Sequence, residues 1–205
     1  MANNHLYTDP LEQWWILALE GDNHAFYSIH RALFDGLYGY ALKLLQDPSL
    51  AGDAVQELFV KIWVKRESIG VIQKVKPYLF TSLRRQVLNQ LRDLRHNKLK
   101  SIGLPEPDID FSPEEIVVRN EEYAALQGRI AALLNTLPQR QKEAIYLHYF
   151  ENMEYAQIAE VMGINYQSVL NLTQKAIQRL RSADLLPVVL SLSALYRLYM
   201  QNGHF

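Results

Sequence analysis

The sequence predicts an all-α protein made of two helical domains, and three observations support that fold class. Apolar side chains recur at intervals of three and four residues in one segment after another, which is the periodicity of amphipathic helices. Alternation of β-branched and polar residues, the usual sign of strands, is absent. The chain has 205 residues, 49% of them apolar, but only 9 glycines and 8 prolines. It is therefore long enough for two small helical domains with separate cores.

The N-terminal part predicts a helical bundle. Leu11–Leu19 and Ala25–Leu45 are apolar at helical spacing. We expect Gln46–Gly52 to form a loop and Asp53 to be the N-cap of the next helix. That helix has a stripe of apolar residues for the core, namely Val55, Leu58, Phe59 and Ile62.

The following helix has two different faces. It comes after a second predicted loop, Ser68–Lys76, and has Pro77 in its first turn. The apolar face predicts a buried stripe of Leu79, Phe80, Leu83, Val87, Leu91 and Leu94. The opposite face carries Tyr78, Arg85, Asn89, Arg92 and His96. Because aromatic rings stack on bases and arginines neutralise phosphates, this face predicts contact with nucleic acid, with a solvated cationic surface as the alternative.

Charge along the chain indicates two surfaces for nucleic acid. The formal net charge is only −1. However, residues 61–100 carry eleven basic and two acidic side chains, and residues 161–205 carry four basic and one acidic. Residues 1–60 and 101–160 are both strongly acidic. Phosphate backbones respond to local positive density rather than to global charge, so both basic segments are candidates.

The second half begins after a predicted linker at 99–112, which has two prolines, a glycine and no periodicity. Ser112 is the expected N-cap of a helix, with Glu115 as its capping-box partner. Tyr123–Leu134 is predicted to be helical, and another helix is expected to run from Leu137-Pro138 to Phe150.

The segment Tyr155–Leu172 has the pattern of a helix-turn-helix. Gly163 is the expected turn, because positive φ is easiest without a Cβ. The inward residues are Ile158, Ala159, Met162, Ile164, Val169 and Leu172. The outward residues are Asn165, Tyr166, Gln167, Leu170 and Asn171, where a recognition helix would meet the major groove, with Lys175, Arg179 and Arg181 following. An ordinary helical hairpin is the alternative.

Several function classes lack support. The chain has no cysteine, its six histidines are scattered, and it contains no HExxH motif, glycine-rich phosphate loop or nucleophile elbow. We therefore expect no enzyme activity, no metal, no cofactor and no small-molecule substrate. No signal peptide is apparent, which favours the cytoplasm. In the tail, residues 185–205, the apolar segment Leu185–Met200 is too short to span a bilayer; it would pack on the second domain or dock reversibly over a binding surface.

Three segments resemble two regions of one family. DAVQELFVKIWVKRESI and KPYLFTSLRRQVLNQLR resemble region two of the extracytoplasmic-function sigma factors of bacterial RNA polymerase. LPQRQKEAIYLHYFENMEYAQIAEVMGINYQSVLNLTQKAIQRLR resembles their region four. The resemblance implies region two at 1–98, a linker at 99–112, region four at 113–184 and the tail at 185–205. It covers about residues 10–182.

The resemblance implies a sigma factor that binds core RNA polymerase, recognises the −10 and −35 promoter elements and initiates transcription. The residues implied to bind the clamp helices of the largest polymerase subunit are Asp53, Gln56, Glu57 and Trp63, with core packing as the alternative for Trp63. Those implied in melting the −10 region and flipping a base are Lys74, Lys76, Tyr78, Arg84, Arg85, Asn89 and Arg92. Those implied in −35 recognition are Asn165, Tyr166, Gln167, Ser168, Leu170, Asn171, Lys175 and Arg179.

The chain departs from the family at two positions. Many members carry a basic residue where this chain has Leu170, and many carry Asn where it has Arg85. The pair Asn171-Leu172 is most similar to members from Bacteroidetes. A membrane anti-sigma factor is a further partner that the resemblance leaves open. The competing interpretation is a stand-alone helix-turn-helix regulator with an N-terminal effector or dimerisation bundle, which does not explain the basic-aromatic face at Tyr78–His96.

Overall fold

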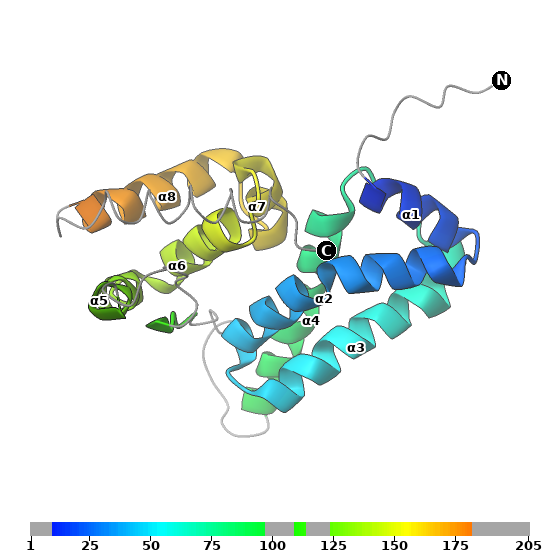
Figure 1. Ribbon diagram of the computed structural model, residues 1–205, viewed down its shortest axis with the longest axis horizontal. Helices are drawn as coiled ribbons and strands as arrows, with labels where there is room; N and C mark the ends of the chain where they lie inside the picture. The colour runs from blue at the N-terminus through cyan, green and yellow to red at the C-terminus, as the bar shows by residue number, and fades with distance from the viewer. Residues whose placement is uncertain (1–9, 97–108, 114–123, 182–205) are drawn as a thin grey trace. The chain divides into compact units, whose positions relative to one another are not determined.

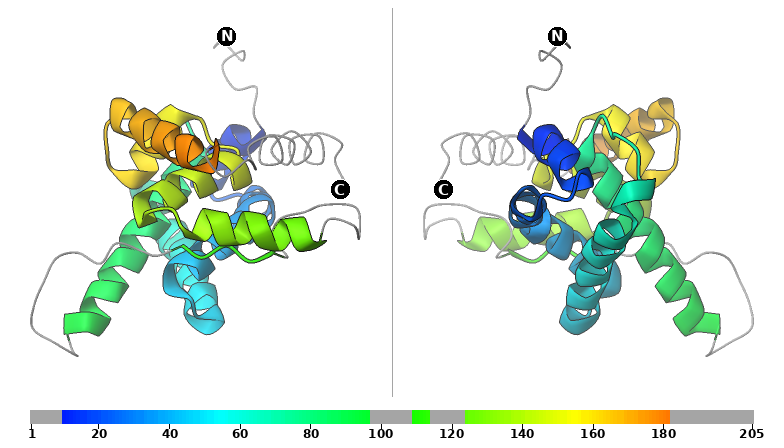
Figure 2. Two further views of the ribbon diagram at one scale, coloured as in Figure 1. Left: turned by 90° about the vertical axis from the view of Figure 1, so that its left-hand side faces the viewer. Right: turned by 90° about the vertical axis from the view of Figure 1, so that its right-hand side faces the viewer.

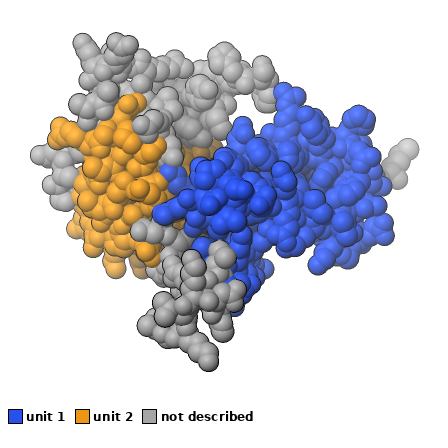
Figure 3. Space-filling model, turned by 90° about the horizontal axis from the view of Figure 1, so that it is seen from below, with its two compact units in different colours: residues 1–105, 160–162 blue, residues 106–159, 163–205 orange. Residues whose placement is uncertain are grey.

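A computed structural model describes residues 10–96, 109–113 and 124–181, and these residues form helices and loops without a strand. The all-α fold class is confirmed. The chain divides into two compact units, residues 1–105 with 160–162 and residues 106–159 with 163–205 (Figure 3). The expected capping-box partner Glu115, most of the linker and the apolar tail lie outside the described residues.

The first unit contains four long helices in its described part (Figures 1 and 2). They are α1 (Pro10–Leu19), α2 (Asn23–Leu45), α3 (Pro48–Lys65) and α4 (Val75–His96), with a short 3₁₀ turn, Arg66–Ser68, after α3. Helix α2 packs against each of the other three, and α4 also packs against α3 and α1. Helix α4 begins at Val75, so the predicted loop ends earlier than expected and Pro77 lies in the first turn.

The core of the first unit lies between these helices. The predicted stripe of α3, Val55, Leu58, Phe59 and Ile62, is buried. On α4, Leu79, Phe80, Leu83 and Val87 are fully buried, and Leu91 is half-buried. The rings of Tyr40 and Phe80, which lie 5.4 Å apart, join α2 to α4. The helical periodicity therefore identified the inward face of both helices correctly.

The start of α3 differs from the sequence-based prediction. The helix begins at Pro48, and its N-cap is Asp47, whose side chain accepts hydrogen bonds from the N–H groups of Ser49 (2.8 Å) and Leu50 (3.0 Å). Asp53 is not a cap but an exposed residue inside the helix. A glycine inside a helix costs about 1 kcal/mol relative to alanine, and Gly52 nevertheless lies within α3, near the buried residues Ala51 and Ala54.

The second unit contains shorter helices. They are α5 (Ala124–Asn135), α6 (Gln139–Ile145), a π-helical turn η4 (Tyr146–Phe150), α7 (Tyr155–Met162), whose last three residues are grouped with the first unit, and α8 (Tyr166–Arg181). The helix predicted to reach Phe150 does so, but its last five residues are π-helical rather than α-helical. Helix α6 packs against α8.

A short segment closes the core of the second unit against the end of α5. The backbone of Phe111 exchanges two hydrogen bonds with the side chain of Asn135: the Phe111 N–H donates to Oδ1 (2.8 Å), and Nδ2 donates to the Phe111 carbonyl (2.9 Å). Ile109 and Phe111 are buried. The other buried apolar residues of this unit include Ile130, Leu134, Leu147, Ile158, Val169, Ala176 and Leu180.

Candidate nucleic-acid interface

The helix-turn-helix has the predicted turn. Gly163 has a φ of +64°, between α7 and α8, and a Cβ there would meet nothing within 4 Å. Glycine is thus favoured by the backbone conformation rather than by lack of space. Ile158, Met162 and Val169 are buried as expected, whereas Ala159, Ile164 and Leu172 are only half-buried.

Asn165 caps the recognition helix. Its Oδ1 accepts a hydrogen bond from the backbone N–H of Ser168 at 2.7 Å. Asparagine is a favoured N-cap because its side-chain oxygen satisfies a backbone donor that has no partner in the first turn. Asn165 was predicted as an outward-facing residue implied in −35 recognition, and not as a cap. It is exposed, and it also fixes where α8 begins.

The remaining candidates on α8 form a continuous outer face. Tyr166 is 52% exposed, Gln167, Asn171, Lys175 and Arg179 are exposed, and Ser168 and Leu170 are half-buried. The Nε2 of Gln167 donates to the Oδ1 of Asn171 at 3.2 Å, one helical turn away. The two amides therefore form a single polar unit at the centre of the face.

Aromatic rings support the start of α8. Tyr166 meets Tyr155, the first residue of α7, with 6.4 Å between ring centroids. Tyr155 is in turn stacked on His148 at 4.6 Å, and the Nδ1 of His148 lies 2.8 Å from the Met153 carbonyl. Sequence reasoning missed His148 and Tyr155, although the aromatic density around YLHYF was a signal for them.

The candidates on and before α4 separate into exposed and half-buried residues. Lys74, Arg85, Asn89 and Arg92 are exposed, and Arg92 is hydrogen-bonded to Asn89. Tyr78, Arg84 and Lys76 are half-buried. Lys76 belongs to α4 rather than to the loop, and its Nζ lies 5.5 Å from the centroid of the Phe80 ring. The side chain of His96 lies outside the described residues.

The candidates on α3 also differ from one another. Asp53 and Gln56 are exposed. Trp63 is half-buried, packs on Phe26 of α2 at 4.9 Å between centroids, and lies under the Arg66 guanidinium at 4.6 Å. Part of the Trp63 side chain therefore packs against α2, as the alternative interpretation of core packing expected.

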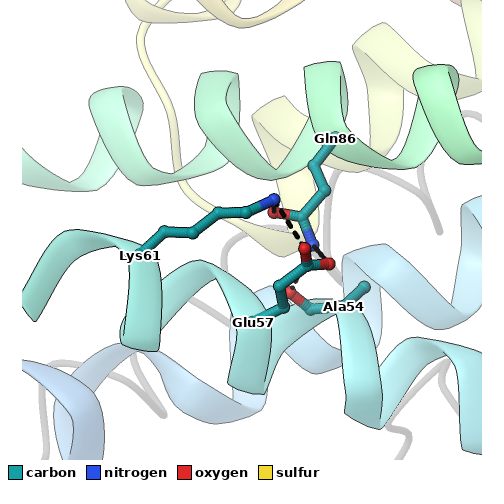
Figure 4. A network of polar contacts seen from close by, with 4 residues as sticks. All are labelled: Ala54, Glu57, Lys61 and Gln86. Carbon is teal, nitrogen blue, oxygen red and sulfur yellow. Dashed lines mark hydrogen bonds and ion pairs between the residues drawn. The ribbon is translucent and has the colours of Figure 1, made fainter. Parts of the chain in front are cut away.

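Glu57 belongs to a polar network that joins α3 to α4 (Figure 4). One of its carboxylate oxygens forms an ion pair with Lys61 at 2.7 Å. Its other oxygen accepts a hydrogen bond from the Nε2 of Gln86 at 2.9 Å, and the same nitrogen lies 2.9 Å from the Ala54 carbonyl. Lys61 also lies 3.5 Å from the Oε1 of Gln86.

An open groove follows this network along the α3–α4 boundary. We call it the α3–α4 groove; it is lined by Glu57, Leu58, Lys61, Ile62, Lys65, Ile69, Tyr78, Ser82, Gln86, Asn89, Gln90 and Asp93. Tyr78 and Asn89 were already candidates for nucleic-acid contact, but Lys61, Lys65 and Gln86 were not. The pairing of Gln86 with Glu57 and Ala54, 29 and 32 positions earlier, leaves no trace in local periodicity.

Two family models match the chain, in the order that the two units follow. Sigma-70 region 2 matches residues 29–97, and sigma-70 region 4 matches residues 127–180. Together they cover more than half of the 205 residues. The chain belongs to the sigma-70 family. The presence of both regions also disfavours the interpretation as a stand-alone helix-turn-helix regulator.

Individual relatives indicate which type of sigma factor this chain is. The extracytoplasmic-function sigma factor SigL of Mycobacterium tuberculosis is 29% identical over 159 residues, which are 75% of this chain and 88% of SigL. SigK of Mycolicibacterium vanbaalenii is 24% identical over 165 residues, 77% of this chain and 79% of SigK. The chain is thus an RNA polymerase sigma factor of the extracytoplasmic-function type.

A solved structure shows the same fold. It is the sigma factor RpoE in complex with the anti-sigma factor NepR from Bartonella quintana, with a TM-score of 0.57, 24% identity, and coverage of 77% of this chain and 94% of that one. Among the described residues of this sigma factor, no helix is long and apolar enough to cross a membrane.

Proposed function

We propose that three helices of this sigma factor have separate roles: α3 binds core RNA polymerase, α4 melts the −10 region and α8 recognises the −35 element. The proposal assigns region two to residues 1–98 and region four to 113–184, joined by the linker at 99–112. The observation that carries it is the presence of two separate exposed polar faces, on α4 and α8, each backed by a buried apolar stripe.

One face of α3 supports core docking. Asp53, Gln56, Val60 and Val64 follow one another at intervals of three or four residues, so they lie on one side of the helix. Val60 and Val64 are 60% and 70% exposed, which is unusual for two valines one turn apart. Apolar side chains with polar neighbours are typical of a protein-binding surface, because their burial against a partner is favourable.

The test of core docking uses residues outside the Glu57 network. Replacing Asp53 and Gln56 with alanine should reduce retention of core polymerase in a pull-down, with an unchanged melting temperature. Asp35→Ala, at an exposed site on α2, is the matched control and should retain core fully. If the double variant retains core as well as the control does, this face of α3 is not the interface.

The exposed face of α4 supports melting. Extracting a base from the stack costs a few kcal/mol, so a melting surface needs both stacking and positive charge. Tyr78 provides an aromatic ring, and Arg85 and Arg92 provide charge at an exposed surface. Lys74 adds a cation in the loop that leads into the helix.

The outer face of α8 supports −35 recognition. Glutamine and asparagine can pair bidentately with adenine, and the apolar side chain of Leu170 suits a thymine methyl group. Lys175 and Arg179, on the later turns, are placed to contact phosphates. The start of α8 carries Asn165, Tyr166 and Ser168, and this is the part of a recognition helix that usually contacts base edges.

Two further assignments complete the proposal. Because RpoE was solved with the anti-sigma factor NepR, we include an anti-sigma factor, one anchored in the membrane, among the partners of this chain. The sigma factor would act on promoters in the cytoplasm, with core polymerase. The Asn171-Leu172 pair supports placing it with members from Bacteroidetes.

A further inference from the structure

The network around Glu57 joins the two surfaces of the first unit that have different proposed partners. Glu57 is a candidate for core binding, whereas Gln86 stands on α4, the helix proposed to melt DNA. Lys61 lies between them, paired with Glu57 at 2.7 Å and 3.5 Å from Gln86 (Figure 4). The side chains of Lys61 and Glu57 are 52% and 56% exposed, so either could change partner without unfolding the helices.

The α3–α4 groove connects Lys61 to the proposed melting surface. Tyr78 and Asn89 line the groove from α4, and Lys61 and Lys65 line it from α3. Its other charged residues are Glu57 and Asp93, so its lysines and carboxylates balance. A carboxylate beside an exposed cation lowers the local positive potential that attracts a phosphate.

We propose that Lys61 is a DNA-contacting residue whose charge is neutralised by Glu57 in the free sigma factor and released when core polymerase binds Glu57. The ligand is the phosphate backbone of single-stranded DNA lying along the α3–α4 groove. This inference rests on the proposed function, because it takes Glu57 as part of the core-binding face.

The consequence is a coupling between core binding and DNA binding. If polymerase favours Glu57 separated from Lys61, and DNA favours the same state, each partner increases the affinity for the other by the same factor. Gln86 holds the network together by donating to both Glu57 and the Ala54 carbonyl, and so acts as a positioning residue rather than a DNA contact.

The first test measures the free full-length chain with a fluorescein-labelled oligothymidine strand, by anisotropy over a range of salt concentrations. Glu57→Gln keeps an oxygen that can accept from Gln86 but removes the charge that neutralises Lys61. We expect it to raise affinity several-fold and to steepen the plot of log affinity against log salt by about 0.7, the value for one phosphate contact on a single strand. In a chain that also carries Lys61→Gln, the same change should have no effect.

The control separates Lys61 from general electrostatics. Arg31 is exposed on α2, and Arg31→Gln removes one positive charge away from the groove. Glu57→Gln should still raise affinity in the Arg31→Gln background. An equal gain in the Lys61→Gln and Arg31→Gln backgrounds would overturn the proposal, because it would mean that any loss of negative charge is sufficient. A melting curve for each variant checks that the helices remain folded.

The second test uses saturating core polymerase and a promoter fragment. Lys61→Gln should then reduce the salt dependence of promoter binding by about 0.7, and Arg31→Gln should leave it unchanged. A salt dependence unaffected by Lys61→Gln would contradict the proposal. Failure of the proposed core docking would be recognised separately. The variant with Asp53→Ala and Gln56→Ala would then retain core polymerase fully. The oligothymidine measurements use the free chain without core polymerase, so they would be unaffected.

Discussion

The ring of Tyr78 on α4 meets the ring of Trp15 on α1 edge to face, with 5.6 Å between their centroids. Trp15 is 1% exposed, whereas Tyr78 is half-buried with part of its ring at the surface. One turn earlier on α1, the buried carboxylate of Glu12 accepts a hydrogen bond from the Val75 N–H, at 3.4 Å. Helix α1 therefore fixes both the start of α4 and the tyrosine that we propose stacks on a base.

Trp15→Ala should destabilise the first unit by about 3–5 kcal/mol, the usual cost of removing a large buried aromatic side chain. Urea unfolding followed by circular dichroism measures this difference. Trp15→Phe should recover part of the loss because an aromatic contact to Tyr78 remains. Trp14→Ala, at the neighbouring half-buried position, is the control and should cost less. Equal costs at both tryptophans would count against the assigned core.

Arg85→Ala combined with Arg92→Ala should leave core binding intact and block open-complex formation. Both side chains are exposed and lie away from the Leu79–Val87 stripe, so their removal leaves no cavity. Permanganate reactivity of unpaired thymines near the start site reports melting directly. Arg31→Ala serves as a control for loss of positive charge. Wild-type reactivity in the double variant would refute a melting role for these arginines.

Asp47→Ala should cost about 1 kcal/mol of stability, because Asp47 caps α3, whereas Asp53→Ala should cost little. Thermal unfolding of the two single variants compares them under the same conditions. The two substitutions should have the reverse order of effect on core retention, since only Asp53 belongs to the proposed docking face. Greater loss of stability from Asp53→Ala would mean that the helix start has been placed incorrectly.

Gln167→Ala and Asn171→Ala should each weaken discrimination at the −35 element by roughly 1–3 kcal/mol, the range for a good bidentate base contact. Because Gln167 donates to Asn171 at 3.2 Å, the double variant should lose less than the sum of the two single losses. Binding to matched and scrambled −35 elements provides the measurement. Equal losses on both sequences would indicate recognition of DNA shape instead.

Lys175→Ala should weaken binding to all sequences alike and reduce the slope of log affinity against log salt by about 0.9, as expected for one phosphate contact on duplex DNA. The side chain is exposed on α8, one turn beyond Asn171. Titrations at several salt concentrations, on matched and scrambled elements, show whether the loss is uniform. A loss restricted to the matched element would make Lys175 a base contact.

The features that were predicted correctly are the local ones. The helix-turn-helix was identified down to Gly163, because helical periodicity and a required positive φ are both encoded in neighbouring residues. The buried stripes of α3 and α4 followed from the same periodicity. At the start of α3, the sequence pattern favoured Asp53 as the cap because Gln46–Gly52 was expected to form a loop. The helix begins at Pro48 with Asp47 as its cap, and Ala51 and Ala54 are buried in the bundle, a burial that depends on the packing of other helices.

The features that were missed depend on contacts between distant residues. Glu57 was predicted as a core-binding residue without partners inside the chain, yet it is paired with Lys61 and Gln86. The stack of Tyr155 on His148 depends on the π-helical turn at Tyr146–Phe150, which periodicity cannot distinguish from an α-helix. The individual roles of the candidate residues in polymerase and promoter binding remain predictions, and the experiments above address them.

The cap at Asn165 has a consequence for how promoter preference could evolve. A substitution there to any residue other than Asp, Ser or Thr would also remove the oxygen that accepts from the Ser168 N–H, so new specificity would come with a weaker helix. In the contacts described above, no side-chain hydrogen bond to the backbone involves Gln167, Leu170 or Asn171. A library intended to redirect this sigma factor to other promoters should therefore keep Asn165 and vary these three positions, where changes of specificity and losses of stability are separable.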